Sequence, residues 1–207
     1  DSRQIYRYMG IGTGESDNPP GIHLTNFIEP SEKYSVSKWQ QAAYYLINQL
    51  KNENKTPIIV GGTGLYIDSL IYLRNYGNGI FPLLPLEFKL ITPKISREEV
   101  YNKINARVEE MFSNGFVQEV EDLLLRNYHN AKSLNGAGYK QVKEYLSNRN
   151  KTLDDFPEIK NSKMPLKPPI FTLEECKDKV KIAYRNYAKR QYTWFRKYSA
   201  DFNVQEI

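Results

Sequence analysis

Cysteine and histidine are scarce in this sequence, with one cysteine and two histidines among 207 residues. Cys176 has no second cysteine with which to form an internal disulfide, and a lone free thiol fits a reducing compartment. A zinc cage needs several Cys or His ligands, so this composition excludes one. His23 and His129 are isolated, and no Ser-His-Asp or paired-carboxylate pattern stands out, so a hydrolase triad is not expected.

Long apolar runs are missing as well. The uninterrupted runs, such as those at 58–60 and 123–125, are short, and a membrane-spanning helix needs roughly 20 apolar residues. We therefore expect no membrane partner. A cytoplasmic location is expected, and an organellar one stays open.

The sequence also contains no G-x-x-x-x-G-K-[ST] phosphate loop. The stretch TPIIVGGTGLYIDSL at 56–70 nevertheless predicts a buried strand at 57–60, a glycine turn at 61–64 and a helix after it. Such a turn can point backbone amides at an anion, and the Thr63 hydroxyl adds a donor. The alternative is that the glycines only permit a tight crossover between strand and helix.

The residues that are present suit a packed core and a basic surface. Apolar residues make up 40% of the chain, enough to fill one substantial core. The 29 Lys and Arg residues exceed the 24 Asp and Glu residues, for a net charge of +5. This balance favours a polyanionic partner without requiring one.

Apolar periodicity and capping signals predict the main helices. A helix, a strand, a glycine turn and another helix in that order favour an α/β fold with parallel strands. We expect residues 1–95 to form the α/β core part and residues 96–207 a helical part, with a Pro-rich linker at 150–169. The expected helices are 36–50 with Ser35 as N-cap, 96–113 with a capping box of Ser96 and Glu99, 116–126, and 173–198.

Two segments carry side chains suited to chemistry. The opening DSRQIY offers a carboxylate to take a proton and polar groups to bind a base edge, although a polar strand end would look the same. Arg107 lies in a helix beside Ile104, Val108 and Met111. Its side chain either covers this apolar seam or reaches into a cleft, where it could bind a diphosphate.

The last predicted helix sorts its basic and apolar residues. Lys177, Lys181, Arg185 and Lys189 recur at every fourth position, and aromatic residues line a neighbouring face. Because acidic residues are few after Asp178, we expect the basic stripe to contact phosphates rather than only solvent. The aromatic residues are expected to be core.

Six segments together resemble, in the same order, the motifs of the tRNA dimethylallyltransferases. They are DSRQIYRYMGIGTG, IEPSEKYS, PIIVGGTGLYID, INARVEEMFSNGFVQEV, GAGYKQ and YAKRQYTWFR. The resemblance implies a P-loop NTPase-like parallel sheet flanked by helices. It also implies transfer of the dimethylallyl group from dimethylallyl diphosphate to the exocyclic N6 amine of the adenosine just 3′ of a tRNA anticodon, assisted by Mg²⁺.

Two parts of the family pattern are absent from this chain. The Walker-like loop that supplies a lysine lies, in the family, before the match to DSRQIY. The family's helical insert, which carries tRNA-gripping arginines, lies between the matches to GGTGLY and INARV. Residues 74–88 are too short to contain that insert.

The resemblance assigns roles residue by residue. Asp1 resembles the general base, Thr63 a catalytic hydroxyl, and Arg107 the cation that steadies the departing diphosphate. The diphosphate site would comprise Gly61, Gly62, Thr63, Gly64 and Arg107, and no metal ligands are assigned. The tRNA-binding residues would be Asp1, Ser2, Arg3, Gln4, Asn135, Gly136, Ala137, Gly138, Tyr139, Lys140, Lys189, Arg190 and Arg196, with Gln4 reading the adenine and Asn135 standing where some members have arginine.

This scheme requires the first four residues and the glycine turn to lie together. Two other functions stay open, an isopentenyltransferase acting on free adenine nucleotides and an RNA-binding protein without catalysis. The segment GAGYKQ and the basic last helix favour a tRNA substrate, bound through the anticodon stem-loop. We expect the protein to act as a monomer.

Overall fold

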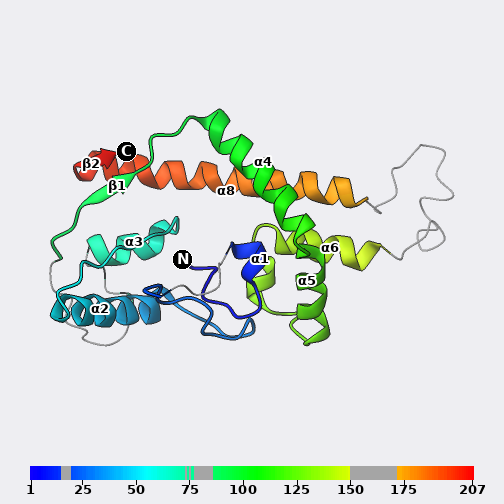
Figure 1. Cartoon of the computed structure of the whole chain (residues 1–207), viewed down its shortest axis with the longest axis horizontal. Coiled ribbons are helices and arrows are strands. Elements are labelled where there is room, and N and C mark those ends of the chain that lie inside the picture. Colours follow the sequence, from blue (N-terminus) through cyan, green and yellow to red (C-terminus); the bar gives the residue numbers. More distant parts are fainter. Residues whose placement is uncertain (15–19, 73, 75, 77–85, 150–171) are drawn as a thin grey trace. The chain divides into compact units, whose positions relative to one another are not determined.

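The computed structural model describes residues 1–14, 20–72, 74, 76, 86–149 and 172–207. The chain folds into two compact units, the first formed by Asp1–Ile95 with Lys189–Ile207 and the second by Ser96–Ala188. Figure 1 shows the elements of both units in sequence colours. The Pro-rich linker expected at 150–169 lies outside the described residues.

The first unit combines helices with a small parallel sheet. Strands β1 and β2 pair in parallel, with Leu90 opposite Val204 and Thr92 opposite Glu206. The expected parallel pairing is therefore present, between strands far apart in the sequence. The elements of this unit are α1 (Gly10–Thr13), α2 (Val36–Asn52), α3 (Gly64–Ile71), β1 (Leu90–Thr92), the end of α8 (Leu173–Asp201) and β2 (Val204–Glu206).

Helix α2 begins where the sequence predicts. The Ser35 side chain accepts a hydrogen bond from the Lys38 amide, which satisfies one of the free N–H groups at the helix start. The rings of Trp39 in α2 and Tyr66 in α3 stack with centroids 4.5 Å apart. The two helices share an apolar core made of Trp39, Ala43, Tyr44, Tyr66 and Leu70.

The predicted strand at 57–60 is wrong. These residues form no strand, and the side chains of Ile58 and Val60 are 83% and 79% exposed. Within the described part of the chain, no backbone hydrogen bond reaches these four residues. A strand forms only where a neighbouring strand accepts and donates its hydrogen bonds, so an apolar run alone does not make one.

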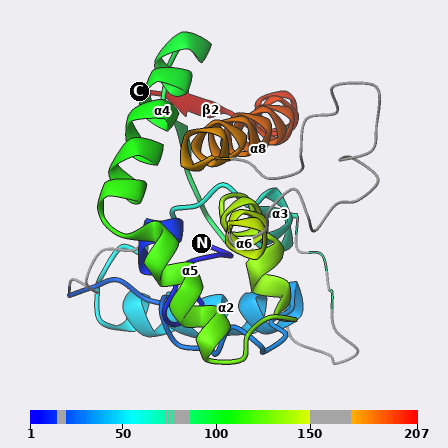
Figure 2. The ribbon, with the colours of Figure 1, turned by 90° about the vertical axis from the view of Figure 1, so that its right-hand side faces the viewer.

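The second unit is helical. Ser96 and Glu99 form the predicted capping box at the start of α4, each side chain bonding the other residue's amide. Gly115 has a φ of 93°, a conformation that glycine adopts without strain. It allows α5 to follow α4 directly (Figure 2). The elements are α4 (Arg97–Ser113), α5 (Phe116–Leu125), the 3₁₀ turn η1 (Lys132–Asn135), α6 (Tyr139–Asn148) and the first part of α8.

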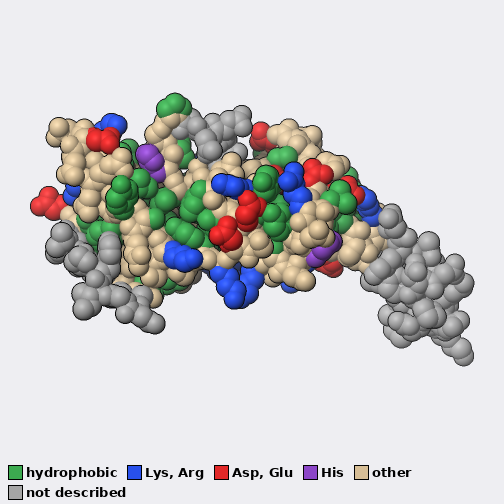
Figure 3. Space-filling model, turned by 90° about the horizontal axis from the view of Figure 1, so that it is seen from below, with side chains coloured by type: hydrophobic (Ala, Val, Ile, Leu, Met, Phe, Trp, Pro, Cys, Tyr) green, Lys and Arg blue, Asp and Glu red, His purple; other side chains and the backbone are tan. Residues whose placement is uncertain are grey.

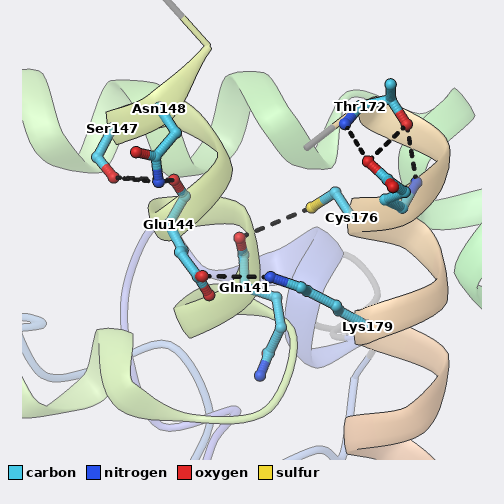
Figure 4. Close-up of polar contacts among 8 residues, drawn as sticks. Gln141, Glu144, Ser147, Asn148, Thr172, Cys176 and Lys179 are labelled. Atoms are coloured by element: carbon cyan, nitrogen blue, oxygen red, sulfur yellow. Dashed lines mark hydrogen bonds and ion pairs between the residues drawn. The ribbon is translucent and has the colours of Figure 1, made fainter. Parts of the chain in front are cut away.

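Cys176 lies in the core of the second unit. Its side chain is fully buried between α8 and α6, and its thiol donates a hydrogen bond to the Gln141 carbonyl (Figure 4). Burial raises the pKa of this thiol to about 12. The neighbouring Lys179 and Glu144 form an ion pair across the same two helices. The thiol is therefore a packing group.

Helix α8 is the longest element, with 29 residues. Like every other helix in the described part of the chain, it lacks the combination of length and apolar content that crosses a bilayer. Its last turns pack on the glycine turn before α3. A Cβ atom at Gly62 would lie 1.8 Å from Nε2 of Gln191, and one at Gly64 would lie 2.2 Å from Cδ2 of Trp194. The glycines at 62 and 64 are therefore required for this close approach.

The buried thiol should be inert in the native protein. A thiol-specific disulfide reagent needs an exposed thiolate, so we expect Cys176 to react at least about 100-fold more slowly in buffer than in denaturing urea. The sequence contains no other cysteine, so the absorbance change reports this residue alone. Stoichiometric labelling of the folded protein within minutes would contradict the packing.

The glycine turn offers a matched pair of substitutions. Gly64→Ala places a methyl group inside the Trp194 ring and should lower the free energy of unfolding by about 1–3 kcal/mol. In Gly61→Ala the new Cβ would lie 3.9 Å from the Cα atom of Asp1, an ordinary contact, so we expect a change within about 0.5 kcal/mol. Urea unfolding measures both. Equal losses would show that close packing is not the cause.

Candidate functional site

The glycine turn at 61–64 is a site with unsatisfied donors. Within the described part of the chain, the backbone N–H groups of residues 61–65 have no hydrogen-bond partner. Thr63 is the N-cap of α3, yet its side chain makes no capping bond. Free N–H groups at a helix start attract anions, because the helix dipole is positive there.

The opening residues meet this turn, as the sequence requires. The hydroxyl oxygens of Ser2 and Thr63 are hydrogen-bonded, 2.7 Å apart. The space beside Gly61 is bounded by the Cα atom of Asp1. The expectation that the opening segment and the glycine turn lie together is therefore confirmed for Asp1 and Ser2. The Thr63 hydroxyl is held by Ser2 instead of by its own helix.

Asp1 offers an unused carboxylate oxygen beside the turn. Its Oδ1 accepts a hydrogen bond of 2.7 Å from the Arg3 amide, a short-range turn that orients the side chain. Oδ2 has no partner among the described residues. The Arg3 guanidinium lies 5.8 Å from the centroid of the Tyr6 ring. A half-buried carboxylate with one open oxygen can accept a proton.

Gln4 is oriented by its amide nitrogen. Nε2 donates to the carbonyl oxygens of Thr13 and Gly14, at 3.4 and 3.1 Å. Two carbonyl partners identify the NH₂ end of the side chain, so Oε1 is the end that stays open. An open amide oxygen accepts from a donor such as an exocyclic amine.

Three residues near the turn were missed by the sequence reasoning. Gln191 and Trp194 fill the space beside Gly62 and Gly64. Asp68, in α3, is 1% exposed and is hydrogen-bonded to Tyr198 and Lys197 of α8. Burial and this carboxylate raise the pKa of Tyr198. The spacing of residues 191, 194 and 198 on one helix face was the signal that could have found the packing.

Arg107 belongs to the second unit. It is exposed, and within the described part of the chain it has neither a hydrogen bond nor an ion pair. The apolar seam of α4 is instead formed by Val108 and Met111, which are both buried. Its guanidinium is thus available, and its role with a diphosphate stays a prediction.

The segment at 135–140 divides into exposed and buried residues. Asn135 and Lys140 are exposed. Gly138 has a φ of 87° and starts α6, with Tyr184 and Phe116 packed against it. Tyr139 is buried, and its hydroxyl donates a hydrogen bond of 2.6 Å to Glu119. Tyr139 therefore supports the turn from inside, and Gly136 and Ala137 are part-exposed between them.

The basic stripe of α8 was expected to contact phosphates, but most of its residues have partners within the protein. Lys177 and Lys181 both pair with Glu109 of α4, at 3.0 and 2.6 Å. These lysines lower the pKa of the Glu109 carboxyl. Arg185 donates to Asn105 and lies over the ring of Tyr101. Glu174 and Asp178, on α8 itself, also pair with Lys177 and Lys181. These three cations are therefore used within the second unit.

The basic residues farther along α8 remain exposed. Lys189, Arg190 and Arg196 all face solvent. The side chains of Lys189 and Arg196 have no partner in the described ranges. Figure 3 shows one face of the molecule, on which blue and red side chains are interspersed. The end of α8 is thus a candidate surface for phosphates.

Comparisons with known proteins place this geometry in a family. The model of the IPP transferase family matches residues 4–82 and 75–198. A tRNA dimethylallyltransferase from Alkaliphilus oremlandii is 31% identical over 268 residues, covering 96% of this chain and 79% of its own length. One from Oenococcus oeni is 30% identical over 223 residues, covering 100% of this chain and 78% of its own length.

A solved structure shows the same fold. The full-length tRNA isopentenylpyrophosphate transferase from Bacillus halodurans superimposes with a TM-score of 0.79 at 27% identity, covering 100% of this chain and 79% of that one. This similarity confirms the α/β fold class expected from the sequence. With a family model that spans most of its residues, the chain belongs to the IPP transferase family.

Proposed function

We propose that this chain transfers the dimethylallyl group from dimethylallyl diphosphate to the N6 amine of the adenosine 3′-adjacent to the anticodon in tRNA. Family membership supports the reaction class. The observation that carries the site is the hydrogen bond between Ser2 and Thr63, which joins the opening segment to the uncapped start of α3. This contact supports a site in which Asp1 would accept the proton beside a turn that would bind the diphosphate.

The cradle would hold the diphosphate of the donor. Free backbone amides of residues 61–65 and the Thr63 hydroxyl can donate to its oxygens. Negative charge grows on the diphosphate as the bond to the allylic carbon breaks, so donors placed there stabilise the transition state more than the ground state. Arg107 is the cation proposed to steady the departing group.

The opening segment would hold the adenine. The open Oε1 of Gln4 accepts from the exocyclic amine, and the N6 nitrogen then attacks the allylic carbon. A new C–N bond forms, the C–O bond to diphosphate breaks, and diphosphate leaves with the electron pair. The N6 proton passes to the open Oδ2 of Asp1, since the amine becomes acidic as the new bond forms.

Magnesium fits this site only as an ion held largely by the substrate. In the described ranges no group of three or more His, Cys, Asp and Glu side chains could hold a metal. Mg²⁺ commonly keeps water and phosphate ligands and needs few from the protein. The Ser2 and Thr63 hydroxyls and the Asp1 carboxylate lie beside the turn and would supply the protein's oxygen ligands. A bound ion would neutralise charge on the diphosphate.

The exposed end of α8 would hold tRNA phosphates, through Lys189, Arg190 and Arg196. Asn135 and Lys140 add exposed polar groups from the second unit. In this proposal, residues 1–95 supply the donor and adenine sites and residues 96–207 contact the anticodon stem-loop. The protein acts as a monomer in the cytoplasm.

The transfer assay tests both the activity and the base. We expect the protein to move label from dimethylallyl diphosphate onto the adenosine beside the anticodon of unmodified tRNA. Asp1→Asn should lower kcat by about 10²–10⁴-fold, because an amide cannot take the proton. The control Asp178→Asn removes a carboxylate that is 71% exposed and should leave kcat unchanged.

The outcomes separate the alternatives. Transfer to free adenine nucleotides but not to tRNA would identify a nucleotide isopentenyltransferase. Tight tRNA binding with no transfer by the wild type would identify an RNA-binding protein. Full activity in Asp1→Asn would remove Asp1 from the role of base.

The two parts of α8 should differ in tRNA binding. Lys189→Ala and Arg196→Ala each remove an exposed cation, so each should weaken binding and reduce the salt slope by about one. Lys177→Ala and Lys181→Ala are matched controls on the same helix. Because Lys177 is paired with Glu109 and Glu174, and Lys181 with Glu109 and Asp178, binding should change less than about twofold. Equal losses in all four variants would show that the whole stripe binds RNA.

A further inference from the structure

Asp68 is a buried carboxylate that the reaction scheme does not use. It lies one turn into α3 and is 1% exposed. Its Oδ1 accepts from the Tyr198 hydroxyl at 2.9 Å, and its Oδ2 accepts from Lys197 Nζ at 3.1 Å. Burying a carboxylate is costly unless its partners are well placed. The pair of partners comes from the last turns of α8, so this carboxylate joins two elements about 130 residues apart in sequence.

The Tyr198 hydroxyl also reaches the turn itself. It lies 3.1 Å from the carbonyl oxygen of Gly64, the first residue of α3. One hydroxyl proton serves two acceptors, the carbonyl and the Asp68 carboxylate, so the oxygen must sit between them. Thr63 immediately precedes Gly64 in the chain, so this contact restrains the backbone next to Thr63.

Helix geometry extends this contact along α8. Gln191, Trp194 and Tyr198 are spaced by three and four residues, so they share one helix face. Gln191 covers Gly62, Trp194 covers Gly64, and Tyr198 binds beyond them. Figure 1 shows the end of α8 beside α3. Anchoring Tyr198 therefore holds the part of α8 that carries Gln191 and Trp194 against the glycine turn.

We propose that Asp68 is a positioning residue for dimethylallyl transfer: it holds Tyr198 and Lys197, and through them keeps the end of α8 on the glycine turn that carries Thr63. This inference rests on the proposed function of that turn. A shift of about 1 Å in a reacting group can cost about 100-fold in rate. Loss of the anchor therefore lowers kcat while the substrates still bind.

A second pair of residues provides the control. The Tyr72 hydroxyl donates to Asp201, so it also joins the end of α3 to α8 through a tyrosine and a carboxylate. It lies at the opposite end of α3 from the turn. Replacing either tyrosine with phenylalanine removes one hydroxyl and keeps the ring, including the Tyr72 ring against which Lys197 packs.

The experiment compares Tyr198→Phe with Tyr72→Phe under conditions in which both are fully folded by urea titration. We expect kcat to fall about 10- to 100-fold in Tyr198→Phe, with KM for both substrates within about threefold of wild type. Tyr72→Phe should keep the wild-type kcat. Asp68→Asn retains an oxygen for Tyr198 and should recover most of the kcat that Asp68→Ala loses.

Amide hydrogen exchange measures the stability of the turn independently of catalysis. The Tyr66 and Ile67 amides donate to the Thr63 carbonyl, so their exchange rates report whether the turn is held. We expect exchange at these amides to be about tenfold faster in Tyr198→Phe and unchanged in Tyr72→Phe. This measurement tests whether Tyr198 holds the turn even if the wild type transfers nothing to tRNA. The absence of transfer would overturn only the proposed function. Equal kcat and equal exchange in the two variants would overturn the positioning role.

Discussion

The close approach of the end of α8 to the glycine turn at 61–64 is the constraint on which the candidate site depends. The Gln191 amide and the Trp194 ring occupy the volume where Cβ atoms would stand at Gly62 and Gly64. On the other side, Ser2 bonds the Thr63 hydroxyl. The turn is therefore clamped between the opening segment and the last helix. Glycine serves two purposes here, since the bare backbone both admits the helix and leaves its amides open.

The same helix uses its charges in two ways. Lys177, Lys179, Lys181 and Arg185 pair with Glu109, Glu144 or Asn105 inside the second unit. Farther along the helix, Lys189, Arg190 and Arg196 face solvent, whereas Lys197 is paired with Asp68. A stripe that looks uniform in the sequence is thus partly structural and partly available to a ligand. The difference arises because Glu174 and Asp178 lie near the start of α8 and Glu109 lies on α4. The contribution of Glu109 cannot be read from the sequence of α8 alone.

Local signals were reliable where the interaction spans a few residues. The N-cap at Ser35, the capping box at Ser96 and the glycine after α4 each involve groups within four positions of one another, and all three are present. The strand expected at 57–60 was wrong, because strand formation depends on a partner that four apolar residues cannot reveal. The roles assigned to Arg107 and to residues 135–140 stay predictions.

The sequence by itself determined the helices that correspond to α2, α3, α4, α5 and α8, the glycine turn and the family. Each of these follows from short motifs whose order and spacing are visible directly. Only the tertiary structure decided that Ser2 holds Thr63, that Asp68 is buried against Tyr198, and that three of the four residues of the basic stripe have partners. These contacts join residues 61 to 130 positions apart. Such pairs form through the packing of whole helices, and no local pattern encodes which side chains will meet.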